Sequence, residues 1–148
     1  MPVGVGFLTF DKSVADFSRT VIPILRRYRP AAVWLFAADP SRNPHAHAEI
    51  IKSLRSASAE ESYHLSIFVQ VGSVAGAREA VEQGVDVIVA QGSDAGGHQW
   101  AKNAGLITIV PEILDMLHKE FPGQKISLFA AGGIADGRGV AAAIALGI

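Results

Sequence analysis

The chain has 148 residues, 49% of them hydrophobic, and its 13 basic and 14 acidic side chains leave a formal net charge of -1. This length supports a compact core, so residues 1–148 are expected to form a single domain. The charges are scattered, and nothing resembles the basic patch that nucleic-acid binding requires. The absence of cysteine excludes disulfides and thiolate chemistry and fits a reducing compartment, with the cytoplasm as the plain expectation.

Apolar runs of strand length alternate with helix-like segments along the chain. The runs cover residues 3–9, 31–37, 65–71, 85–90 and 126–131. They do not alternate polar with apolar residues, which is typical of parallel strands covered on both faces. The segments between and after them show helical spacing or are rich in alanine, and Pro111 fits a first helical turn. These segments cover residues 14–27, 46–57, 74–83, 109–121 and 137–146. The sequence therefore predicts about five βα units.

Five βα units fit two architectures, an open flavodoxin-like sheet or part of a closed (β/α)8 TIM barrel, and periodicity alone leaves both open. The first strand begins almost at Met1, and the last helix stops at Ile148, where another strand is expected. These ends favour a partial TIM barrel, truncated at both ends. No apolar stretch approaches the roughly 20 residues of a membrane span, so neither an anchor nor a signal peptide is expected.

The segment QGSDAGGH, residues 91–98, directly follows the run VDVIVA. In α/β proteins ligands bind at the carboxyl ends of the strands, which is where this segment is expected. Gln91 could hydrogen-bond a polar heterocycle, and Gly96 and Gly97 could expose backbone amides to an oxyanion or a ring heteroatom. His98 adds a group that exchanges a proton near neutral pH. The alternatives are a tight turn for the glycines and a structural hydrogen bond or helix cap for His98.

A second glycine-rich segment, AAGGIADGRGVAAAIALG, runs from the last strand into an alanine-rich helix. Gly132 and Gly133 are expected at the strand end and Asp136 at the helix cap, an arrangement suited to cradling a phosphate. The spacing is not that of the dinucleotide fingerprint G-x-G-x-x-G. Close packing of helix on strand is the alternative for the small residues. In the first segment, the alternative to a ligand-binding role for Asp94 is that this residue only forms a turn.

Other polar residues support weaker hypotheses. His45 and His47 form an H-x-H pair without a third ligand candidate, so no metal site is expected. Ser73 lacks the G-x-S-x-G context of a nucleophile. Trp100 could either cover a pocket or fill a gap in the core. The loop DPSRNP, residues 39–44, follows a strand and is expected on the same face as the other strand ends.

At the two glycine-rich segments the sequence resembles the nitronate monooxygenase family, FMN-dependent (β/α)8 barrels once called 2-nitropropane dioxygenases. The resemblance rests on VDVIVAQGSDAGGH followed by AAGGIADGRGVAAAIALG, against a family pattern of Q-G-x-E-A-G-G-H and a later A-A-G-G-I with D-G-R-G. PVGVGFLTF and VWLFAADP agree more weakly with two further strand ends of the family.

The resemblance implies that Gln91 and Gly96 contact FMN, with Gly97 in the same loop, and that Gly132 and Gly133 lie at its phosphate. It implies that His98 is the active-site histidine, acting on a nitronate or nitroalkane that is oxidised with O2. A homo-oligomer is left open. Two alternatives also stay open: an enzyme similar to the flavin-dependent enoyl-acyl-carrier-protein reductases, and a non-catalytic remnant that binds flavin or phosphate.

The chain departs from the family pattern at several positions. Gly6 stands where an asparagine that touches the flavin is frequent, and Asp94 replaces a glutamate. Gln99 and Trp100 replace the Arg-Gly that often follows the histidine. The family's final strand, with the G-T-R-F segment that completes its phosphate site, would follow Ile148.

Overall fold

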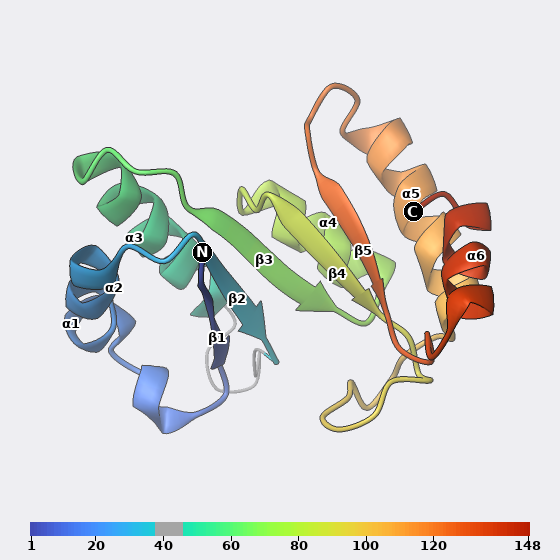
Figure 1. Ribbon diagram of the computed structural model, residues 1–148. Helices are drawn as coiled ribbons and strands as arrows, with labels where there is room; N and C mark the ends of the chain where they lie inside the picture. Colours follow the sequence, from blue (N-terminus) through green and yellow to red (C-terminus); the bar gives the residue numbers. More distant parts are fainter. Residues whose placement is uncertain (38–45) are drawn as a thin grey trace.

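The computed structural model describes residues 1–37 and 46–148. In these ranges five strands form one parallel sheet (Figure 1). The strands are β1 (Gly4–Leu8), β2 (Ala32–Phe36), β3 (Ser66–Val71), β4 (Val87–Gln91) and β5 (Ser127–Ala131). The helices are the 3-10 helix η1 (Lys12–Val14) and α1 (Phe17–Thr20), α2 (Ile22–Tyr28), α3 (Ala46–Glu60), α4 (Val74–Glu82), α5 (Leu106–Glu120) and α6 (Gly137–Ala145).

The strand order β1-β2-β3-β4-β5 decides between the two architectures. A doubly wound sheet reverses its order at a switch point, whereas a (β/α)8 barrel adds each strand beside the one before. Crossovers between parallel strands are right-handed, so adding strands in one direction places every helix on the same side of the sheet. Figure 1 shows the helices along the outside of the curved sheet. The described chain is therefore five consecutive βα units of a barrel, as the sequence predicted.

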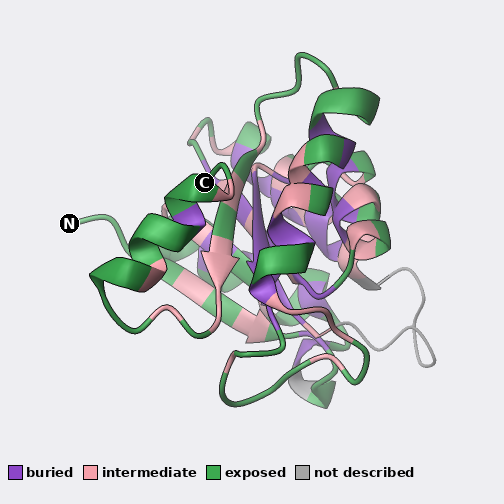
Figure 2. Ribbon diagram, turned by 90° about the vertical axis from the view of Figure 1, so that its right-hand side faces the viewer, coloured by how far each residue is buried: buried purple, intermediate pink, exposed green. Residues whose placement is uncertain are grey.

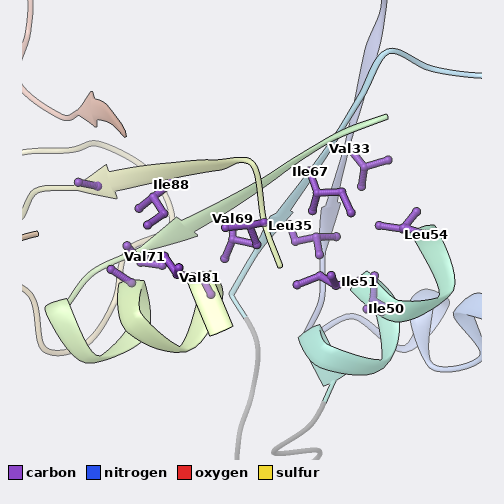
Figure 3. Packing of buried hydrophobic residues seen from close by; sticks show 14 of the residues in the cluster. Val33, Leu35, Ile50, Ile51, Leu54, Ile67, Val69, Val71, Val81 and Ile88 are labelled. Atoms are coloured by element: carbon purple, nitrogen blue, oxygen red, sulfur yellow. The ribbon is translucent and has the colours of Figure 1, made fainter. Parts of the chain in front are cut away.

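The convex face of the sheet carries the main core. Its largest fully buried side chains come from β2, β3 and β4 and from the helices that cover them (Figure 3). Leu35 of β2, Ile67 of β3 and Leu54 of α3 each have no exposed surface and belong to one cluster. Burying a side chain of this size contributes roughly 1.5 to 3 kcal/mol, so the helices are held to the sheet by this face.

The concave face is covered only in part, so the sequence prediction of strands buried on both faces is confirmed for β4 and wrong for the other four strands. One row across the sheet runs Gly6, Trp34, Phe68, Val87 and Ser127. Within this row Trp34 is 36% exposed, and only Val87 of β4 is buried. Most side chains of the concave face are apolar, as in a barrel interior, yet no second layer formed by the described residues covers them.

Aromatic rings on the concave face report the curvature of the sheet. Phe68 on β3 and Phe129 on β5 meet edge to face with ring centroids 5.8 Å apart, although β4 lies between their strands. Alternate strands of a flat sheet would be about 9.6 Å apart, so the rings lean together over β4 and bury it. Trp34 stacks on Phe68 at 5.7 Å, and its indole N–H donates to Gln70 Oε1 at 3.0 Å.

Two helix predictions need correction. The single helix predicted over residues 14–27 is divided into η1, α1 and α2, because Pro23 lies in the first turn of a new helix. Helix α5 begins at Leu106, three residues earlier than predicted. Pro111 therefore lies in its interior, where it leaves the carbonyl of Ile107 without its helical partner. None of the described helices is long and apolar enough to cross a membrane.

Candidate functional site

The structure brings the two glycine-rich segments into direct contact at the carboxyl edge of the sheet. Gly92 N–H donates to the Ala131 carbonyl at 2.8 Å. A Cβ on Gly132 would lie 2.9 Å from the backbone nitrogen of Ala95, and one on Gly133 would lie 3.0 Å from a side-chain atom of Asp94. Both glycines also have positive φ, at 121° and 69°. The loop after β4 thus lies on the end of β5, where only glycine leaves it room.

Gln91 is the last residue of β4 and is only 3% exposed. Its Nε2 donates to the carbonyl of His98 at 2.9 Å, which ties the far end of the loop to the strand. Its Oε1 is buried and has no hydrogen-bond partner among the residues that the structure describes. Because buried polar atoms are almost always paired, this oxygen is suited to accept a hydrogen bond from a ligand.

The tip of the loop is open to solvent. Gly96, Gly97 and His98 are exposed, and a Cβ on either glycine would meet nothing within 4 Å. Gly97 has a φ of 77°, which glycine adopts without strain. The His98 ring lies beside Phe10, just past the end of β1, with ring centroids 6.0 Å apart. The three residues predicted to bind or react therefore line an accessible surface near the end of β1.

Asp94 has a role that the sequence did not reveal. Its Oδ2 accepts a hydrogen bond from the Leu106 N–H at 3.4 Å, in the first turn of α5. The N-cap residue of α5 is Gly105, which has no side chain to cap the helix. The carboxylate supplies a cap from the loop, where it also interacts favourably with the positive end of the helix dipole. Because glycine at the N-cap position cannot cap the helix with a side chain, Gly105 was the feature of the sequence that could have indicated a capping residue in another segment.

Asp136 caps α6, as predicted. Its carboxylate accepts hydrogen bonds from the backbone N–H groups of Arg138 at 2.9 Å and Gly139 at 3.3 Å. The hydrogen bond from the Arg138 side chain, followed by these two backbone bonds, lowers the pKa of Asp136 below its ordinary value. Two amides of the α6 N-terminus are thus already taken. A phosphate at this edge would depend chiefly on the amides of Gly132 and Gly133.

His47 and Thr9 form a second polar contact at the strand ends that sequence reasoning missed. The Thr9 hydroxyl donates to the Phe36 carbonyl at 3.0 Å, so the His47 Nε2 at 2.7 Å must be the donor to Thr9 Oγ1. Burial lowers the pKa of His47 to about 4, which keeps the imidazole neutral at pH 7. These two residues are 38 positions apart, and no local pattern predicts their contact.

The remaining sequence hypotheses have simpler outcomes. Ser73 is the N-cap of α4 and accepts a hydrogen bond from the Gly76 N–H at 3.1 Å. Trp100 packs on Gly72 and also lines a cavity of about 310 Å³ with His47. His45 and the loop 39–44 lie outside the described residues. Within the described ranges no group of three or more His, Asp or Glu side chains could hold a metal ion.

A parallel sheet in sequential order, with helices on its convex side and two touching glycine-rich loops at its carboxyl edge, defines the class of protein: an α/β barrel. The sequence matches the family "Nitronate monooxygenase" over residues 28–148. The chain belongs to the nitronate monooxygenase family.

Curated relatives agree with this assignment. A nitronate monooxygenase of Neurospora crassa is 47% identical over 153 residues, an alignment that covers 98% of this chain and 39% of the relative. The nitronate monooxygenase npaC of Metarhizium robertsii is 40% identical, covering 99% of this chain and 38% of the relative. The chain therefore spans about two fifths of the length of these relatives.

Solved structures agree on the fold. FabK from Thermotoga maritima, as its M276A mutant, superposes with a TM-score of 0.73 at 26% identity, covering 99% of this chain and 41% of the other. Nitroalkane oxidase from Streptomyces ansochromogenes superposes with a TM-score of 0.66 at 20% identity, covering 99% and 47%. The latter similarity bears on the fold alone.

Proposed function

We propose that this chain carries the cofactor-facing strand ends of an FMN-dependent oxidoreductase that oxidises alkyl nitronates or nitroalkanes with O2. Family membership and the 47% identity to a nitronate monooxygenase support the reaction class. The observation that carries the site is the unpaired, buried Oε1 of Gln91, at the base of the loop that ends in His98. A buried acceptor that is unpaired among the described residues is suited to a donor from a ligand.

The residues present fit a flavin ring better than they fit its phosphate. An isoalloxazine carries an N–H donor, which Gln91 Oε1 could accept, and ring acceptors that the open amides of Gly96 and Gly97 could serve. Gly132 and Gly133 would hold the phosphate through their backbone amides. Their lack of side chains is already required by the neighbouring loop, so this part of the proposal rests on the family resemblance.

When bound, FMN supplies an electron acceptor that can also react with O2. The chain itself supplies proton handling and orientation. His98, exposed at the loop tip beside Phe10, would accept a proton from the carbon next to a nitro group, or stabilise an anionic nitronate when protonated. Gln91, through its bond to the His98 carbonyl, holds that segment over the strand end.

The visible spectrum of the purified protein with added FMN is the first test. Bound flavin gives a shifted blue absorbance that co-elutes with the protein in gel filtration, and the mixture should consume O2 when an alkyl nitronate is added. A protein that stays colourless after incubation with FMN would overturn the cofactor proposal. O2 uptake that is independent of nitronate would overturn the proposed reaction.

Matched histidine variants then test the role of His98. His98→Ala should keep the flavin and lose about 10²- to 10⁴-fold in turnover, which is the usual contribution of a general base. His118→Ala is the control, because His118 is exposed in the last turn of α5, away from the strand ends. Equal turnover in the two variants would remove His98 from the mechanism.

The same assay separates the enoyl-acyl-carrier-protein reductase alternative. That reaction would oxidise a nicotinamide cofactor in the presence of an enoyl thioester, with no need for nitronate. Flavin binding without turnover of either substrate would leave the non-catalytic binding module as the function of this chain.

A further inference from the structure

The indole of Trp100 rests directly on the backbone of Gly72, just past the end of β3. A Cβ on Gly72 would lie 2.3 Å from Trp100 Cδ1 and 2.6 Å from its Cγ, distances that real atoms do not reach. The φ of Gly72 is not in the left-handed region, so glycine is not needed there for its backbone conformation. It is needed because any side chain would displace the indole.

Trp100 also contacts the end of β2. Its ring meets that of Phe36 edge to face, with centroids 5.7 Å apart and an interplanar angle of 88°. Phe36 is the last residue of β2 and is buried. The loop that leaves β4 is therefore fastened by one side chain to the ends of two other strands, in a geometry that aromatic pairs favour.

His98 lies between two attachment points of this loop. On one side, Gln91 Nε2 holds the His98 carbonyl at 2.9 Å. On the other, Trp100 is only two residues further along the chain. The tip before His98 has little support of its own, because Gly96 and Gly97 have no neighbours within 4 Å of where a Cβ would be. Besides the contact of the imidazole with Phe10 and the hydrogen bond from Gln99 Nε2 to the Ala95 carbonyl, these two attachments are what hold His98 against the strand ends.

We propose that Trp100 is a positioning residue for His98, and that its indole, seated on Gly72 and against Phe36, fixes the loop that carries the imidazole. The catalytic part of this inference rests on the proposed function, whereas the fastening of the loop does not. The contact acts by packing, since the indole Nε1 is buried without a hydrogen-bond partner among the described residues. A phenyl ring should therefore serve as well, because it fills the same seat and leaves no unpaired donor.

The first experiment measures fastening without activity. Trp34 is the only other tryptophan, so a Trp34→Phe background leaves Trp100 as the sole reporter of fluorescence. Gly72→Ala in this background should shift the emission to the red and lower the order parameter of the His98 amide from about 0.85 toward 0.6 or less. Gly137→Ala is the control, since a Cβ there meets nothing within 4 Å. Unchanged emission and order in Gly72→Ala would overturn the proposal.

The second experiment asks whether Trp100 acts through His98. Trp100→Ala should lower kcat for nitronate oxidation about tenfold or more while leaving flavin affinity nearly unchanged, and Trp100→Phe should restore it. In a His98→Ala background the same Trp100→Ala change should have almost no further effect, because residues that act as a unit are not additive. Additive losses would overturn the positioning role. A protein without flavin or turnover would contradict the proposed function, and the fluorescence result would still decide whether the loop is fastened.

Discussion

The two glycine-rich strand ends have similar compositions and opposite surroundings. In the loop after β4, Gly96 and Gly97 are open to solvent, and Gln91 Oε1 at its base is unpaired among the residues that the structure describes. At the end of β5, Gly132 and Gly133 are pressed against the neighbouring loop, and helix α6 is capped by its own carboxylate. Figure 2 shows the contrast in burial between the sheet interior and the exposed loops around it.

This difference separates two uses of glycine. After β5, Gly132 and Gly133 lie against the loop that follows β4, and packing leaves no room for a side chain at either position. At the tip of the loop after β4, Gly96 and Gly97 are exposed and leave open space that a ligand could occupy. Substitutions of Gly132 or Gly133 should therefore lower the stability of the fold, whereas substitutions at the loop tip after β4 should weaken ligand binding.

Gly132→Ala should have the largest effect on the free energy of unfolding. The new Cβ would lie 2.9 Å from the backbone nitrogen of Ala95, and the φ of 121° is one that side chains rarely adopt. We expect a loss of about 3 kcal/mol from strain and overpacking, measured by urea denaturation. Gly96→Ala, where the Cβ meets nothing within 4 Å, should stay within about 0.5 kcal/mol. Equal losses would show that the two ends are not packed differently.

Gln91→Leu should weaken flavin binding with little change in fold. The leucine keeps the buried volume but removes both the donor to the His98 carbonyl and the unpaired acceptor. Loss of such a hydrogen bond costs about 1 to 3 kcal/mol, which corresponds to roughly 5- to 150-fold in the Kd for FMN measured by fluorescence titration. Gln124→Leu, an exposed change outside the site, is the control. Unaltered affinity in Gln91→Leu would exclude this side chain as a flavin contact.

Asp94→Ala should lower stability by an amount typical of a lost helix cap, about 1 kcal/mol. The carboxylate is the acceptor for the Leu106 N–H, and Gly105 cannot replace it. The melting temperature measured by circular dichroism should fall, whereas Asp115→Ala, an exposed change on the same helix, should leave it nearly unchanged. The capping role would be refuted by a melting temperature equal to that of the unmodified chain.

Asp136→Asn should have the smallest effect, a slightly lower urea midpoint near neutral pH that disappears in acid. Because Arg138 and two backbone amides lower the pKa of Asp136 below its ordinary 3.8, this carboxylate stabilises the folded state above that value. The stabilisation is lost as the pH falls through the lowered pKa. The urea midpoint of the unmodified chain should therefore decline more steeply below about pH 4 than that of the variant. Parallel curves would contradict the assignment.

Strands and helices were predictable from the sequence because each apolar run is long enough to read locally. Periodicity alone did not predict the strand order, since the order depends on pairing between distant residues; the resemblance to a (β/α)8 barrel family did predict it. The sequence assigned Gln91 to the loop, whereas the structure makes it the last residue of β4. Its side chain is buried there, so both its amide nitrogen and its amide oxygen need hydrogen-bond partners. The pair of Thr9 and His47, and the seat of Trp100 on Gly72, join residues far apart in sequence, so no spacing rule could reveal them.

The cap that Asp94 places on α5 has one further consequence. The Leu106 amide is protected from deuterium exchange only while the loop after β4 holds its folded position, because its acceptor belongs to that loop. A ligand that stabilises the loop in its folded position should slow deuterium exchange at the Leu106 amide. A ligand that displaces the loop should accelerate this exchange. Mass spectrometry of a peptide spanning the start of α5 would thus register events at the strand ends, even for a compound without colour.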